Sequence, residues 1–263
     1  MNRVKPILRT LAAAAALALV GAHAGAVEFT DPRGDDKGPG NYTYPTDGVY
    51  KSGSFDIVKF SAVKSGANVD FSVDVASNLE DPWGMGGGFA VQMIFVFVKT
   101  GAPGGRADTW TGLNVKFAPG HEWNKVIVLS PQKKARVTSE ADAKLGALAK
   151  DVLVPNLTRG RGRTITGSIP LADLGGDGNV DGWGYQVVMQ SNEGFPAATD
   201  FLTRKVNEYE GQHRFGGGND GDCDPHVMDV LDGADAKQAE MLAYECGPNG
   251  ESKKMAMLKM VRK

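Results

Sequence analysis

The sequence has 263 residues, of which 41% are hydrophobic and 23% are charged, and this composition supports an ordinary globular core. The formal net charge of −2 argues against a broad basic surface for nucleic acid, and two cysteines with four histidines are too few for a zinc cluster, a four-cysteine iron–sulfur site or a c-type haem motif. The 35 glycines and 13 prolines predict many turns and favour short strands over long helices.

Residues 1–26 have the pattern of a cleaved secretory signal. Three basic residues in the first nine positions precede an apolar run at 11–20 that is too short to cross a bilayer, and alanines at 22, 24 and 26 suit cleavage. Removal of the signal takes away three of the 29 basic residues and leaves 26 against 31 acidic ones, a net charge of −5. The sequence therefore predicts one exported domain at 27–263, periplasmic or secreted, with no membrane span.

Strand patterns dominate the rest of the chain. Residues 56–63 and 68–76 alternate between apolar and polar positions around a short turn, which predicts an antiparallel hairpin. Residues 89–99 are apolar nearly throughout, as in a central strand that is covered on both faces. Further strands are predicted at 124–130, 163–170 and 183–191, and the tail at 254–262 fits either a strand or a short helix.

Only two segments have a helical pattern. Residues 138–152 place apolar side chains at helical spacing, and Ser139 stands three positions ahead of an acid as a variant of the capping box. Residues 234–244 follow Asp232, a suitable N-cap, and end shortly before a glycine. Short strands with one or two inserted helices favour an all-β sandwich.

Acidic side chains gather at the start of the predicted domain. Asp31, Asp35 and Asp36 lie within six residues, among glycines and prolines that fix the backbone, and their oxygens suit a hard cation such as calcium. The alternative is a solvated loop in which the aspartates cap turns. A second acidic loop, at 177–182, opens like an EF-hand but lacks the glutamate needed at position twelve, so it predicts only a turn before a strand.

The two cysteines, Cys223 and Cys246, would be expected to pair in an oxidising compartment. They would close a loop of about 23 residues, worth about 3 kcal/mol if the bond is unstrained. A redox-active pair is the alternative, and the absence of Cys-x-x-Cys spacing disfavours it.

Six motifs resemble those of the C-terminal binding module of glucodextranase. In chain order they are DPRGDDKGPGNYTYP at 31–45, GSFDI at 53–57, DPWG at 81–84, GWGY at 182–185, FGGG at 215–218 and DPHVMDVL at 224–231. The resemblance covers almost the whole predicted domain. It implies a jelly-roll β-sandwich similar to family 9 carbohydrate-binding modules and DOMON domains, without catalytic activity. It also implies a polysaccharide or cell-envelope glycan as the partner, and it strengthens the expectation of calcium at Asp31, Asp35 and Asp36.

Glycan binding by such a module needs an aromatic surface for the CH face of a sugar and polar groups for its hydroxyls. Trp83 and Trp110 fall in predicted loops, where an indole could be exposed, although Trp83 could equally plug a turn. Trp183 opens a strand, a position that favours burial. Gln186 follows it and would either hold sugar hydroxyls or hydrate an exposed face.

Three alternative functions have weaker support in the sequence. No pair of acids is singled out by its spacing, and neither a Gly-x-Ser-x-Gly elbow nor a His-Glu-x-x-His motif is present, so no enzyme is predicted. DOMON relatives can bind haem b, for which Met93 and Met189 are candidate ligands, but methionines within strands are mostly core residues. A structural or partner-binding envelope protein without a sugar site is the third alternative.

Overall fold

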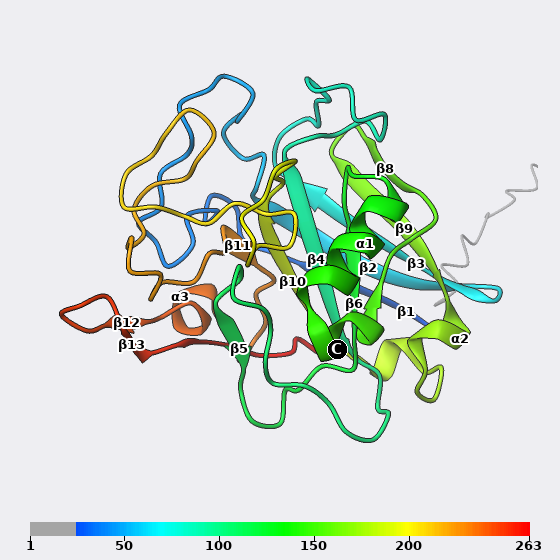
Figure 1. Cartoon of the computed structure of the whole chain (residues 1–263). Coiled ribbons are helices and arrows are strands. Elements are labelled where there is room, and N and C mark those ends of the chain that lie inside the picture. The colour runs from blue at the N-terminus through cyan, green and yellow to red at the C-terminus, as the bar shows by residue number, and fades with distance from the viewer. Residues whose placement is uncertain (1–24) are drawn as a thin grey trace, which may run out of the picture.

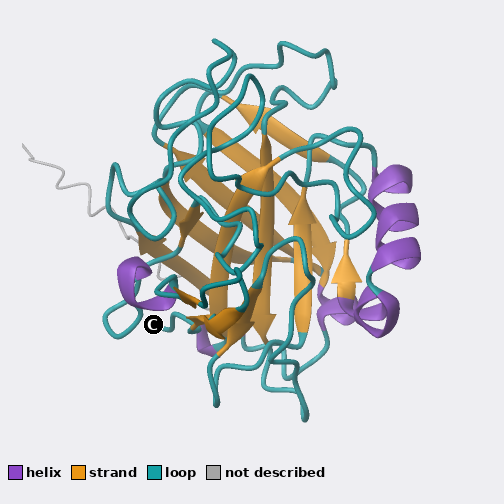
Figure 2. Cartoon of the chain, turned by 60° about the vertical axis from the view of Figure 1, so that its left-hand side comes forward, coloured by secondary structure: helices purple, strands orange, loops and turns teal. Residues whose placement is uncertain are grey.

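The computed structural model describes residues 25–263 and shows two facing five-stranded sheets, which confirms the predicted all-β sandwich (Figures 1 and 2). The first sheet has the order β1 (Ala26–Thr30), β2 (Ile57–Ser65), β3 (Asn68–Val75), β9 (Thr164–Pro170) and β8 (Thr158–Arg161). The second has the order β11 (Asp229–Val230), β10 (Gly184–Ser191), β4 (Gln92–Lys99), β6 (Lys125–Leu129) and β7 (Val152–Leu153).

The remaining elements are short. Two further pairs are formed by β5 (Val115–Phe117) with β14 (Ala256–Leu258), and by β12 (Glu245–Cys246) with β13 (Ser252–Lys254). The helices are α1 (Lys134–Lys144), α2 (Leu171–Leu174) and α3 (Gln238–Met241), with 3₁₀ turns at Gly146–Asp151 and Val180–Gly182. The tail that fitted either a strand or a helix thus forms two short strands.

The predicted hairpin and central strand are confirmed. Strands β2 and β3 pair antiparallel up to Ser65 opposite Asn68, and Gly66 in the turn takes a φ of +59°, which glycine adopts without strain. Strand β4 lies between β10 and β6 and is buried along nearly its whole length. This burial on both faces explains why its sequence is continuously apolar rather than alternating.

Aromatic side chains join the two sheets. Phe60 of β2 and Phe29 of β1 face Tyr185 of β10, with ring centroids 5.3 and 6.4 Å apart, and all three belong to or pack against one hydrophobic core. Their removal from water is the main force holding the layers together.

The first helix begins four residues before the predicted range of 138–152, and the second half of that range is not α-helical. The α-helix covers Lys134–Lys144, so Ser139 lies in its interior and caps nothing. After Leu145 the chain continues as a 3₁₀ turn, because Gly146 takes a φ of +53° and breaks the α-helical path. The leucines at 145 and 148 still reach the core from this changed backbone.

The second helix is much shorter than predicted. Only Gln238–Met241 is helical, and Lys237 rather than Asp232 precedes it. Asp232 instead accepts a hydrogen bond from the Gln238 backbone N–H across a turn, while the Gln238 side chain, itself buried, donates to the carbonyls of Asp35 and Gly38. These tertiary bonds fix the segment more strongly than its helical propensity does.

The predicted signal, residues 1–26, lies outside the described residues except for its last two. Ala26 already belongs to β1 and pairs with Val63. Among the residues that the structure describes, none of the helices combines the length and apolar character that crossing a bilayer requires.

Candidate functional site

Three carboxylates from distant parts of the sequence converge where the two sheets meet. Asp31 follows β1, Asp35 lies in the next loop, and Asp229 begins β11 at the edge of the second sheet. One oxygen of each lies within 4.8 Å of one oxygen of the others, a spacing at which one cation could contact all three. Asp56, just ahead of β2, is close enough to influence the other three electrostatically.

Backbone N–H groups fix three of these four side chains and leave one oxygen of each without a partner. Asp31 accepts from the N–H of Asp232 at 2.5 Å, Asp56 from Gly34 at 2.8 Å, and Asp229 from Ile57 at 2.6 Å. The other oxygens of these three, together with Oδ1 of Asp35, are buried and have no hydrogen-bond partner. An unsatisfied buried carboxylate oxygen is costly, so the converging carboxylates of Asp31, Asp35 and Asp229, with Asp56 nearby, favour a cation that would compensate them.

Burial and mutual repulsion raise the pKa values of these groups. Desolvation raises the pKa of Asp31 to about 8 and that of Asp35 to about 6, and neighbouring carboxylates add to both shifts. The pKa of Asp229, which is completely buried, is raised well above its ordinary value by the same causes, and that of Asp56 is raised as well. A bound cation would reverse this effect by stabilising the ionised forms.

The structure separates Asp36 from the other two candidate ligands and brings Asp229 to them. Asp36 is not part of the converging group; its carboxylate accepts a hydrogen bond from the Tyr44 hydroxyl instead. Asp229 takes its place, with Asp56 beside it. The signal for Asp229 was present in the sequence, because a lone acid between Met228 and Val230 in an apolar strand needs a specific partner.

In chelator, we expect the stability of the protein to fall as the pH rises. A carboxyl group whose pKa is raised in the folded protein stabilises the fold below its pKa in the unfolded chain, which is about 4. This contribution is lost as the pH rises through the pKa in the folded protein, which is about 6 for Asp35 and about 8 for Asp31. Each such group contributes a slope of up to about 1.4 kcal/mol per pH unit. Melting curves of the Asp31→Asn variant should show a flatter dependence between pH 6 and 8, and a slope equal to that of the wild type would contradict the assignment.

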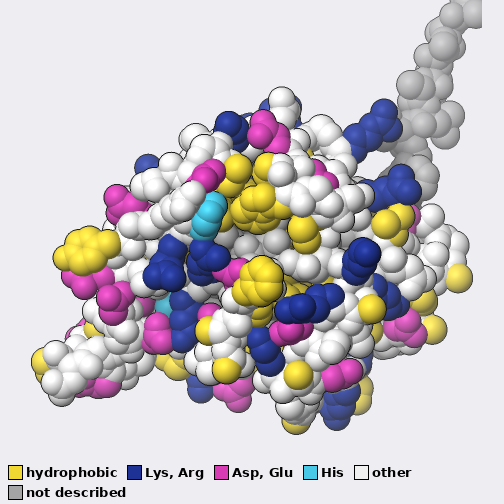
Figure 3. Space-filling view, turned by 45° about the horizontal axis from the view of Figure 1, so that its top comes forward, with side chains coloured by type: hydrophobic (Ala, Val, Ile, Leu, Met, Phe, Trp, Pro, Cys, Tyr) yellow, Lys and Arg dark blue, Asp and Glu magenta, His cyan; other side chains and the backbone are white. Residues whose placement is uncertain are grey.

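Trp83 is the exposed tryptophan, at the loop end of the sandwich. It lies between β3 and β4, and 41% of it is accessible. Asp81 locks the turn beneath it by accepting from the N–H groups of Met85 and Gly86, both at 2.8 Å. The rings of Tyr50 and His213 meet the indole edge-to-face at 6.3 Å each. Figure 3 shows this end of the molecule, where hydrophobic, histidine and basic side chains gather.

The other proposed sugar contacts are buried, which corrects the expectation for them. Trp110 packs against Phe95, 4.8 Å away, and against Phe201, because the loop that carries it folds over the second sheet. Trp183 is in the core, and its ring N–H donates to Asp177 at 2.9 Å. Neither indole offers a face to a ligand.

Gln186 also has a structural role. Its side chain is fully buried and donates to the carbonyls of Leu231 and Lys259, so it ties two C-terminal segments to β10. Met93 and Met189, the candidate haem ligands, are fully buried in the packed core, so their placement gives the haem alternative no support.

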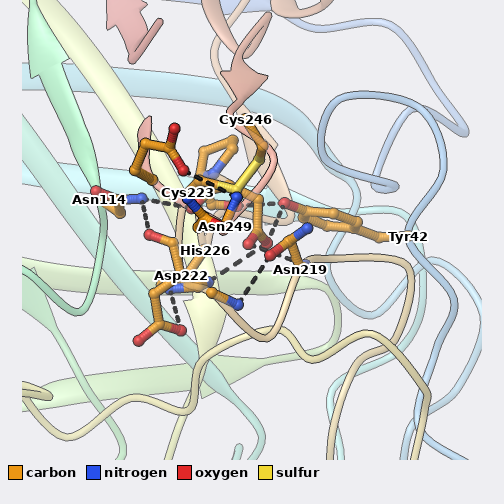
Figure 4. Close-up of a disulfide and its surroundings, with 12 residues drawn as sticks. Tyr42, Asn114, Asn219, Asp222, Cys223, His226, Cys246 and Asn249 are labelled. Carbon is orange, nitrogen blue, oxygen red and sulfur yellow. Dashed lines mark hydrogen bonds and ion pairs between the residues drawn. A yellow bond between two sulfur atoms is a disulfide. The ribbon is translucent and has the colours of Figure 1, made fainter. Parts of the chain in front are cut away.

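The predicted disulfide between Cys223 and Cys246 is confirmed (Figure 4). It joins the loop around Asp222 to β12, with the Cα atoms 5.6 Å apart. Asn114 donates to the carbonyls of Asp222 and Asp224, and the buried His226 lies 3.6 Å from a carboxylate oxygen of each aspartate. The bond therefore fixes a loop that also carries buried polar groups.

Two facing sheets with their long loops at one end define a β-sandwich module. A family model described as the SLH-like C-terminal binding module of glucodextranase matches residues 26–261. The chain therefore belongs to this family, whose members are binding modules rather than catalytic domains, and carbohydrate binding is the function that membership suggests. No curated protein matches the chain significantly.

Proposed function

We propose that this protein is an exported, noncatalytic module that binds a polysaccharide or cell-envelope glycan through Trp83 and is stabilised by calcium. The observation that carries glycan binding is the exposed indole, held rigidly at the loop end of a sandwich that belongs to a family of binding modules. A pyranose has an apolar CH face, which packs on such an indole, and the nearby polar side chains suit its hydroxyls.

Calcium is the cation that the acidic cluster fits best. Asp31, Asp35 and Asp229 offer oxygen ligands only, and calcium takes six to eight oxygens. Asp56 and water would complete the shell. Because Asp229 belongs to the second sheet and binds the N–H of Ile57 in the first, an ion here would join the two layers at the start of the domain.

Export is supported by three features. The first 26 residues have the pattern of a secretory signal, and the disulfide is typical of an oxidising compartment. The family description is SLH-like, which is compatible with a role at the cell envelope. These features agree with a periplasmic or secreted module.

Trp83→Ala should weaken glycan binding about tenfold or more, because a central aromatic contact contributes much of the affinity of a small binding surface. Affinity electrophoresis through gels containing dextran or pullulan measures this as loss of retardation. Leu157→Ala, which removes an exposed apolar side chain from a different loop, is the matched control and should migrate as the wild type does. Equal retardation of Trp83→Ala and the wild type would contradict glycan binding by the Trp83 indole.

A further inference from the structure

A polar hollow of about 490 Å³, lined by residues between 193 and 214, is large enough for a small ligand. Its polar lining includes Glu193, Asp200, Thr203, Arg204, Lys205 and Arg214. Arg204 connects the hollow to Trp83 through one residue: it donates to the backbone carbonyl of His213 at 2.7 Å, and the His213 ring contacts the indole. The basic side chains that gather at this end of the molecule are visible in Figure 3.

Most of the charges around the hollow are already paired. Arg204 binds the carboxylate of Glu193, whose other oxygen accepts from the N–H of Phe195 at 2.8 Å. Lys205 forms an ion pair with Asp222 at 2.5 Å. The opposite charges within each pair cancel, so the hollow is not strongly basic despite its three cationic side chains. The paired side chains hold one another in place along its lining.

Two charged groups of the lining remain available. The guanidinium of Arg214 has no hydrogen bond or ion pair within residues 25–263. The carboxylate of Asp200 forms no ion pair there; one of its oxygens accepts from the Thr199 hydroxyl at 3.0 Å, and the Lys144 ammonium binds its backbone carbonyl instead. Thr203 is fully buried, so its hydroxyl is out of reach of a ligand. One cationic donor and one anionic acceptor form a neutral pair, which matches the adjacent acceptors and donors of sugar hydroxyls.

We infer that this hollow is a second sugar subsite, which binds the hydroxyls of a neutral glycan through Asp200 and Arg214. The inference rests on the proposed glycan binding at Trp83 and specifies its ligand: an uncharged oligosaccharide that extends from the indole across His213 into the hollow. Asp200 accepts from hydroxyl groups, and Arg214 donates to hydroxyl oxygens. Arg204 acts as a positioning residue, since its donors are used by Glu193 and His213.

Asp200→Asn and Arg214→Ala test binding at this site. The asparagine oxygen can still accept from the Thr199 hydroxyl, and the Arg214 guanidinium has no partner to lose within residues 25–263, so the melting temperature of both variants should stay close to that of the wild type. Retardation in dextran gels should nevertheless weaken about tenfold in each, because a charge-assisted hydrogen bond to the sugar is lost. Arg159→Ala, an exposed arginine on β8, is the control and should behave as the wild type.

The outcomes distinguish the subsite from the proposed function. If Trp83→Ala loses retardation while Asp200→Asn and Arg214→Ala keep it, the hollow is not a subsite and glycan binding at Trp83 stands. If carboxymethyl dextran binds more tightly than dextran and Arg214→Ala abolishes the difference, the hollow recognises an anion and the neutral class is wrong. If the wild type is not retarded by dextran, pullulan or carboxymethyl dextran, both the subsite and the proposed function fail.

Discussion

Saturating calcium should raise the melting temperature of chelator-treated protein by about 10 °C. An ion present at about a thousand times its dissociation constant stabilises the folded state by about 4 kcal/mol, and a domain of this size gains about 2–4 °C per kcal/mol. The physical source is the set of buried, unpartnered oxygens of Asp31, Asp35, Asp56 and Asp229, which repel one another until a cation lies between them. Differential scanning calorimetry in chelator, and then in excess calcium, measures the shift.

The Asp229→Asn variant tests whether the calcium-dependent rise in melting temperature comes from the cluster of Asp31, Asp35 and Asp229. The asparagine oxygen can still accept from the N–H of Ile57, so the link between the sheets is preserved while the buried charge is removed. The variant should be at least as stable as the wild type in chelator at pH 8 and should lose most of the calcium response. Asp70→Asn, which removes an exposed carboxylate on β3, should keep the full response. A calcium shift in Asp229→Asn equal to that of the wild type would place the ion elsewhere.

Reduction of the disulfide should lower the free energy of unfolding by about 3 kcal/mol, equivalent to a fall in melting temperature of roughly 10 °C. Cys223 and Cys246 are 23 positions apart, so the bond removes considerable freedom from the unfolded chain. The double variant with alanine at both positions should melt at the lower temperature with or without reductant. If reduction frees both thiols of the wild type and its melting temperature does not change, the disulfide has no stabilising role.

The sandwich was predictable because its long strands have clear patterns. Strands β2 and β3 alternate, and β4 is continuously apolar because both of its faces are covered. Strands of two residues, such as β7 and β11, are too short to have a period and exist only because a neighbouring strand pairs with them. The helices were misplaced for a related reason, since Gly146 and the buried contacts of Gln238 override local propensity.

The candidate sites were only partly predictable. Asp31 and Asp35 could be chosen as candidates because they are close together in an unusual loop, whereas Asp229 joins them only through the pairing of β11 with β10. Trp83 and Trp110 could not be separated by sequence, because both lie in loops and only the packing of one loop over the second sheet buries Trp110. The polar hollow depends on which charges pair in space, and sequence spacing does not reveal this.

Binding without hydrolysis is the most direct test of a glycan-recognition module. Purified protein, with its disulfide intact and calcium present, would be run through dextran and pullulan gels, and the same polymers would be incubated with it and assayed for new reducing ends. We expect retardation on at least one polymer and no reducing ends above the buffer control. Migration unchanged by either polymer, or release of reducing ends that follows the protein through purification, would contradict the proposed function.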